Sequence, residues 1–227
     1  MAAAWVQSVS AQGGFGTTVT TAGITTTTGN VVMLDNFYSA TFSSNSDSNT
    51  NGWGSNSVAK VTNVGGLKGQ QNYNASITGG ASHTFTGTYT GNGFPIIAAT
   101  ELSGCDASPL DVVVSATTPF STAHSTGATG NTTANGIAVG FMCTNNGQSN
   151  TADAWTQRLQ AAHGIILATT PTTSGNAYTY ASTSPAPDGS CQWVTTWKEA
   201  SAGGITGPLV GGHLIHRGAL KGGRLVS

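Results

Sequence analysis

The sequence predicts an all-β fold, namely an antiparallel, jelly-roll-like β-sandwich with an extended C-terminal arm. Short runs of strand-forming residues recur along the chain and are separated by Gly-rich turns, the spacing typical of sandwiches and jelly rolls. The best helix window, residues 153–163, also alternates in polarity as a strand does, and we expect a strand there. Ser, Thr, Asn and Gly replace charges, which make up 7% of the chain, as on a hydroxyl-rich sheet surface.

For two of the expected strands, the sequence pattern also predicts which faces are buried. In 82–90, Phe85 and Tyr89 alternate with threonines, which predicts one core-facing side and one solvent-facing side. The segment 94–102 is apolar on both sides, as in a central strand. Low-complexity stretches at 17–30 and 42–57 indicate loops or surface strands, and Asn-Gly pairs predict tight hairpins. The other expected strands are 31–34, 58–64, 110–115, 136–143, 164–168 and 192–198.

The chain divides into an expected body, residues 1–200, and a Gly/Leu-rich basic arm, residues 201–227. The arm repeats the triplet Gly-x-Leu four times, and no carboxylate follows Glu199. A segment this short has no core of its own, so its leucines must be buried on the body or on a partner. The residues that we expect to contact a partner are Leu209, Leu214, Arg217, Leu220, Lys221, Arg224 and Leu225.

Charge and hydropathy argue against two classes of partner. The net charge is −1, and the body has only Lys60, Lys68, Arg158 and Lys198 for phosphate groups, so we expect no nucleic-acid binding. No apolar run is long enough to span a membrane, and residues 1–7 lack the basic start of a secretory signal.

A calcium site is one hypothesis for the Ser/Asn-rich stretch. Asp47, Asn49 and Asn51 match the first half of a calcium loop, D-x-N-x-N-G, in which alternate oxygens converge on the ion. The position that should hold a bidentate Glu is Val58, which removes the strongest ligand. A hairpin at Asn51-Gly52 is the favoured alternative, and no other cofactor is expected.

Carboxylates and aromatic residues supply few other candidates for chemistry. Glu101, Asp106 and Asp111 form the one acidic grouping that a glycosidase could use, with turn formation as the favoured interpretation. No serine-hydrolase or phosphate-loop motif occurs, so we expect no enzymatic activity. Trp53, beside a predicted turn, is the best candidate for an exposed ring that stacks on a sugar. The three cysteines have no metal-binding spacing; reduced, buried thiols are favoured over one disulfide.

Several body segments together resemble a group of β-sandwich proteins found in phages, prophages and bacterial genomes. The resemblance implies a non-enzymatic sandwich of virion or surface proteins, and the arm is similar to terminal arms by which phage structural proteins hold their neighbours. The segments are 101–104 (ELSG), 108–111 (SPLD), 133–141 (TANGIAVGF), 155–158 (WTQR) and 193–198 (WVTTWK).

These observations lead us to expect a phage virion structural protein, either a head decoration or cement protein or a tail adaptor or fibre component. Its partners would be major capsid or tail proteins and further copies of itself. It would be made in the host cytoplasm and located in the virion. The alternative is a carbohydrate-binding host-adsorption module of a virion or cell surface, with a host glycan as ligand. A glycan-cleaving enzyme built on Glu101 is the least favoured hypothesis.

Overall fold

The computed structural model describes residues 1–39, 41–53, 57–62, 66–145, 151–161 and 164–201. This part of the chain is all-β, without a helix, and its strands pair antiparallel. It therefore contains no helix that could span a membrane.

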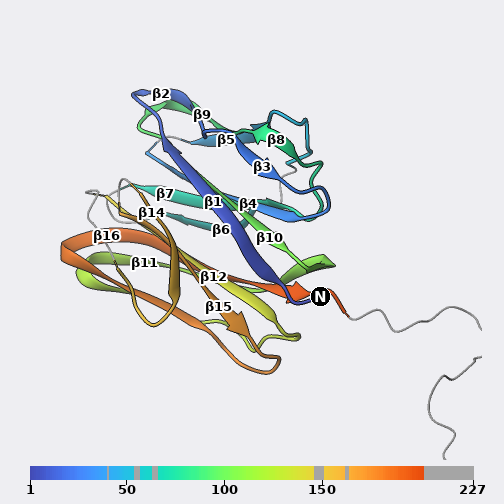
Figure 1. Cartoon of the computed structure of the whole chain (residues 1–227). Helices are drawn as coiled ribbons and strands as arrows, with labels where there is room; N and C mark the ends of the chain where they lie inside the picture. The colour runs from blue at the N-terminus through green and yellow to red at the C-terminus, as the bar shows by residue number, and fades with distance from the viewer. Residues whose placement is uncertain (40, 54–56, 63–65, 146–150, 162–163, 202–227) are drawn as a thin grey trace, which may run out of the picture.

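The strands form four sheets (Figure 1). The five-stranded sheet has the order β1 (Ala4–Gln12), β10 (Ile96–Ser103), β4 (Val31–Tyr38), β7 (Lys68–Asn74), β6 (Ser57–Thr62). The six-stranded sheet has the order β11 (Cys105–Ala128), β16 (Thr179–Glu199), β12 (Gly136–Thr144), β15 (Ile165–Thr172), β14 (Thr156–Ala161), and β13 (Thr151–Ala152) pairs with β16. The smaller sheets are β2 (Gly16–Thr20), β9 (Phe85–Gly93), β5 (Phe42–Asp47) and the pair β3 (Ile24–Thr26), β8 (Gly80–His83).

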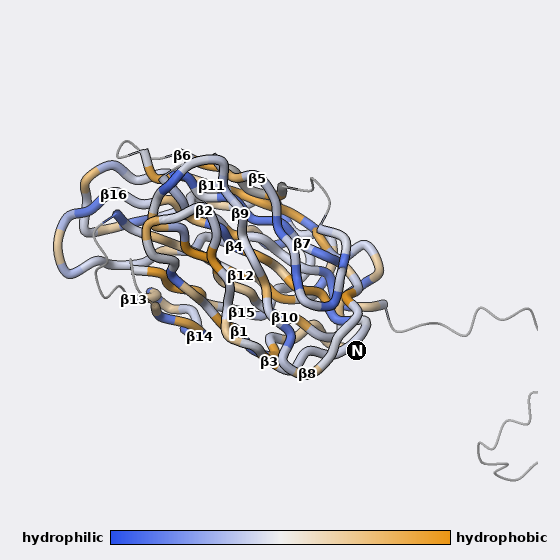
Figure 2. The backbone as a smooth tube through the Cα atoms, turned by 90° about the horizontal axis from the view of Figure 1, so that it is seen from above, coloured by the Kyte–Doolittle hydropathy of each residue, from blue (hydrophilic) through white to orange (hydrophobic). Residues whose placement is uncertain are grey.

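The five-stranded sheet lies between the six-stranded sheet and the smaller sheets (Figure 1). Its strands β4 and β10 are buried on both faces because apolar clusters form on each side. One cluster joins Phe37 to Phe141 and Trp193 of the six-stranded sheet, whose rings stack at centroid distances of 5.0–5.3 Å. The other cluster joins alternate residues of β4 and β10 to Phe85 and Tyr89 of β9. The apolar stretches of β4, β10, β12 and β15 run through the interior (Figure 2).

Several expected strands are confirmed, and most are longer than predicted. Strand β10 is the central strand expected from its apolar faces, and β9 buries Phe85 and Tyr89 while Thr90 is exposed. Residues 156–161 form a strand, β14, rather than a helix. The tryptophan pair Trp193 and Trp197 is fully buried, and all three cysteines are free.

Other expectations were wrong for identifiable reasons. Asn92-Gly93 forms the end of strand β9, where Gly93 pairs with Gly16 of β2, rather than a hairpin turn. Asp188-Gly189, a similar turn-forming pair, lies within strand β16, because pairing with β11 continues on both sides of it. The strand expected to begin at Phe94 begins two residues later, and Phe94 is exposed in the turn before it. The polar strand β7 and the N-terminal strand β1 were not predicted.

The last described strand ends beside the N-terminus. The backbone N–H of Ala200 donates to the carbonyl oxygen of Gly104 at 2.8 Å, and the Met1 amino group donates to the Ala200 carbonyl at 3.4 Å. Figure 1 shows the N-terminus next to the end of β16. The first residue of the chain and the last residue of the body, Ala200, therefore lie at the same end of the body.

Candidate functional site

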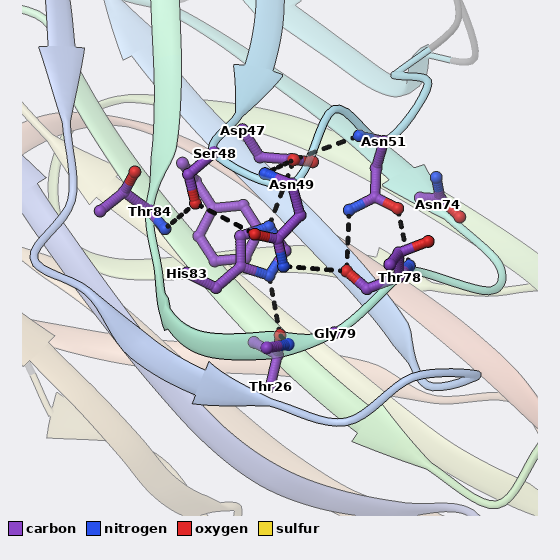
Figure 3. Close-up of polar contacts among 12 residues, drawn as sticks. Thr26, Asp47, Ser48, Asn49, Asn51, Asn74, Thr78, Gly79, His83 and Thr84 are labelled. Atoms are coloured by element: carbon purple, nitrogen blue, oxygen red, sulfur yellow. Dashed lines mark hydrogen bonds and ion pairs between the residues drawn. The ribbon is translucent and has the colours of Figure 1, made fainter.

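Asp47 is the centre of a hydrogen-bonded loop (Figure 3). Its side chain is fully buried, and its Oδ1 accepts hydrogen bonds from the backbone N–H groups of Asn49 at 2.8 Å and Asn51 at 3.2 Å. The side-chain amides of Asn49 and Asn51 both donate to the carbonyl oxygen of Thr78, and the Thr78 N–H donates to Asn51 Oδ1 at 2.7 Å. The loop therefore fastens the end of β5 to the segment before β8.

A buried histidine continues this network into the protein. The Thr26 hydroxyl lies 2.7 Å from His83 Nδ1, and His83 Nε2 lies 3.3 Å from Asp47 Oδ1. The tautomer with its hydrogen on Nε2 suits both contacts, because the threonine hydroxyl then donates to Nδ1 while Nε2–H faces the carboxylate. Thr26, His83 and Asp47 thus form a chain of polar groups across β3, β8 and β5. All three are shielded from solvent, which suits a structural role.

Trp53, the candidate for an exposed ring that stacks on a sugar, is half-buried in the same loop. Its indole N–H donates to Asp47 Oδ2 at 2.5 Å, and its ring packs edge-on against Phe85 at a centroid distance of 6.0 Å. The side chain is half-buried against the second apolar cluster. Trp53 therefore contributes packing and a hydrogen bond here.

The loop does not have the geometry of an oxygen cage. Both Asp47 oxygens accept N–H donors, and Asn49 and Asn51 turn their amide nitrogens toward Thr78. Among the described residues, no group of three His, Cys, Asp or Glu side chains is arranged to hold a metal ion. Calcium binding by Asp47, Asn49 and Asn51 stays a hypothesis, and the hydrogen bonds explain this sequence pattern without an ion.

Glu101 is buried and tied to three donors. Its Oε1 accepts from the Thr27 N–H at 2.8 Å and the Asn30 amide at 2.7 Å, and its Oε2 accepts from the Gln7 amide at 2.6 Å. Glu101 is 1% exposed. Its hydrogen bonds connect β10 to β1 and to the turn before β4. Nearby in sequence, Asp106 accepts the Ser108 N–H, as a turn residue does.

Asp111, the third member of that acidic grouping, also makes local contacts. Its carboxylate accepts the N–H and the hydroxyl of Thr133, at 2.8 Å and 2.6 Å. These contacts explain the grouping as turn and loop chemistry, the interpretation that the sequence favoured.

A fully buried carboxyl that the sequence did not single out lies between the two large sheets. Asp35 Oδ1 accepts hydrogen bonds from Gln71 at 2.7 Å and from the Trp193 indole at 3.0 Å. Its Oδ2 has no hydrogen-bond partner among the described residues. Burial raises the pKa of Asp35 to about 7, while the two hydrogen bonds oppose the rise.

Two exposed aromatic side chains lie next to each other on the body. Phe15, in the turn after β1, is 69% exposed, and Phe94, in the turn before β10, is 56% exposed. Their ring centroids lie 5.7 Å apart, and the Gly13 N–H donates to the Pro95 carbonyl, which holds the two turns together. The sequence signal was an aromatic residue among turn formers: Gly13, Gly14 and Gly16 around Phe15, and Gly93 and Pro95 around Phe94.

The predicted partner-binding residues of the arm, Leu209 to Leu225, lie outside the described residues. No family model, curated protein or solved structure matched the chain.

Proposed function

We propose that the chain is a non-enzymatic structural protein of a phage virion, which docks on neighbouring subunits through its C-terminal arm. Its role would be head decoration or cementing, or that of a tail adaptor or fibre component. In this proposal the stacked sheets of the body form a jelly-roll-like sandwich. The observation that carries the proposal is the arm sequence, four Gly-x-Leu triplets that follow a body whose last strand ends at Glu199.

The body surface supports a docking role. Phe15 and Phe94 expose most of their rings side by side, and Phe120 on the edge strand β11 is 74% exposed. Exposed aromatic side chains are enriched where proteins contact one another. Few charges oppose close approach of a neighbour, because charged residues are 7% of the chain and the net charge is −1.

The energetics define what the arm needs from its partner. Burial of one leucine side chain contributes about 1.5–3 kcal/mol, so the four triplet leucines supply about 6–12 kcal/mol. Ordering the backbone costs about 1–2 kcal/mol per residue, which exceeds that gain over the length of the arm. Backbone hydrogen bonds must therefore add to the binding, as they do when a segment adds a strand to a sheet edge. Edges to which such a segment could add are the two edge strands of the six-stranded sheet, β11 and β14.

A double substitution in the arm tests this role. Leu214→Ser with Leu220→Ser should leave the body folded by circular dichroism and abolish incorporation into particles. The matched control is Val210→Ser with Ile215→Ser, which removes two apolar side chains of the same arm but keeps every triplet leucine. Incorporation of the leucine double variant at the wild-type copy number would refute the docking role of the triplets.

A further inference from the structure

A cavity of about 300 Å³ opens where the edge strand β1 meets the six-stranded sheet. Its walls come from the start of β1 and from strands β12, β14 and β15. The lining includes Trp5, Thr156, Arg158, Thr169, Thr170 and Pro171. Among the described residues, its lining contains one charged side chain, that of Arg158, and no carboxylate.

Two contacts fix the orientation of this guanidinium. The Arg158 Nε donates to the Thr169 hydroxyl at 2.9 Å, and Thr169 itself is 2% exposed. The Arg158 Cζ atom lies 4.7 Å from the centroid of the Trp5 ring, within the range of a cation–π contact. Trp5 is in turn held by its indole N–H, which donates to the Ser8 hydroxyl at 3.0 Å.

The terminal nitrogens of Arg158 are free to bind a ligand. No carboxylate of the described residues forms an ion pair with Arg158, and no acceptor in that part of the chain binds its Nη groups. A guanidinium whose Nε is already bound and whose Cζ lies over an aromatic ring offers a pre-organised pair of donors. Such a pair suits the two oxygens of a carboxylate.

The geometry points to a binding site for a carboxylated monosaccharide, such as a uronic or sialic acid at the end of a glycan. The carboxylate would pair with the Arg158 Nη groups, while the hydroxyl of Thr156, which lies opposite Thr169 in the pairing of β14 with β15, would bind a sugar hydroxyl. Trp5 and Pro171 supply apolar walls for the C–H faces of the ring. A volume of about 300 Å³ is at the small end of ligand pockets, which fits one sugar residue. This site goes beyond the proposed docking role and depends on neither the arm nor the exposed aromatic pair.

Saturation-transfer NMR with glucuronate and N-acetylneuraminate tests the site on the full chain. We expect binding of at least one acid in the millimolar range, and Arg158→Gln should weaken it about tenfold or more, since a hydrogen bond to a charged group contributes roughly 1.5–3 kcal/mol. The matched control is Lys198→Gln, which removes one positive charge outside the cavity and should leave binding unchanged. Thr156→Val, which removes the threonine hydroxyl that would bind the sugar, should also weaken binding.

Three results would overturn the proposal. The first is the absence of binding by both acids, and the second is unchanged binding by the Arg158→Gln variant while circular dichroism shows a native fold. The third is binding of glucose or acetate as strong as that of the sugar acids, because the site would then recognise the sugar ring alone or the carboxylate alone. None of these results bears on incorporation into particles, so a failure here is distinct from a failure of the docking role.

Discussion

The substitution Asp35→Asn isolates the most unusual group of the interior. Asparagine keeps the size of the side chain and a carbonyl oxygen that can accept from Gln71 and Trp193, the two donors that now bind Asp35 Oδ1. It removes the ability to ionise and places an amide NH2 group where the second carboxyl oxygen lies. Asp35 is fully buried, and its second oxygen has no hydrogen-bond partner among the described residues, so the charged form is the costly one.

The expected effect follows from the shift in the pKa of Asp35, from an ordinary value of 3.8 to about 7 in the folded chain. Between these values the folded state keeps a proton that the unfolded state has released. The free energy of unfolding therefore falls as the pH rises. A shift of about 3 units at about 1.4 kcal/mol per unit gives a loss of about 4 kcal/mol between pH 4 and pH 7. The stabilisation is fully present below pH 4 and is lost as the pH rises through the folded pKa.

Urea unfolding of the wild type and of the Asp35→Asn variant over this pH range measures the effect. The difference between the two curves is the quantity of interest, because other buried groups cancel in it. One such group is His124, whose pKa is lowered by burial in both proteins. The two proteins should be similarly stable near pH 4, and the variant should be the more stable one near pH 7. Parallel pH profiles would refute the reasoning, since they would show that Asp35 ionises without cost.

Three further predictions use the same unfolding assay. Glu101→Gln should destabilise the body by about 1–3 kcal/mol, because an amide cannot accept from all three donors that now bind the carboxylate; an unchanged midpoint would contradict the joining role of Glu101. Gly69→Ala should cost about 1–3 kcal/mol, because its Cβ would lie 2.5 Å from the Trp193 ring. Gly52→Ala, which meets no atom within 4 Å, is its matched control and should be nearly neutral. Calcium in place of chelator should leave the urea midpoint unchanged, since the loop around Asp47 is satisfied by N–H donors; a clear rise in the midpoint would support a calcium site.

The sequence predicted the apolar strands of the interior but not the polar strand β7. Strands such as β10 show a run of apolar residues that only burial on both faces explains. The sequence of strand β7 is typical of a loop, because its three central residues, Gln70, Gln71 and Asn72, are polar; all three are nevertheless buried. Gln70 donates to Asn72 within the strand, but the partner of Gln71 comes from a distant position: Gln71 lies opposite Asp35 of β4 and donates to its carboxylate. Such pairing depends on strand order, which no local pattern contains.

The candidate sites illustrate the same limit. The pattern around Asp47 offered a calcium loop as one hypothesis beside the favoured hairpin, but it did not indicate that His83 and Thr78, from a remote part of the chain, complete the hydrogen bonds of that loop. Trp5 and Arg158 are 153 positions apart in sequence, and only the packing of β1 against the other sheet brings them into contact. The exposed pair of Phe15 and Phe94 was within reach of sequence analysis, because both rings sit among turn-forming residues.

Limited proteolysis with mass spectrometry tests the docking role most directly, on the isolated chain and on the particles that contain it. Arg217, Lys221 and Arg224 provide trypsin sites within the arm. Docking of the arm on a neighbouring subunit predicts cleavage at these sites in the free protein and protection in the particle. Equal protection in both states would contradict it, because the leucines would then be buried on the chain's own body.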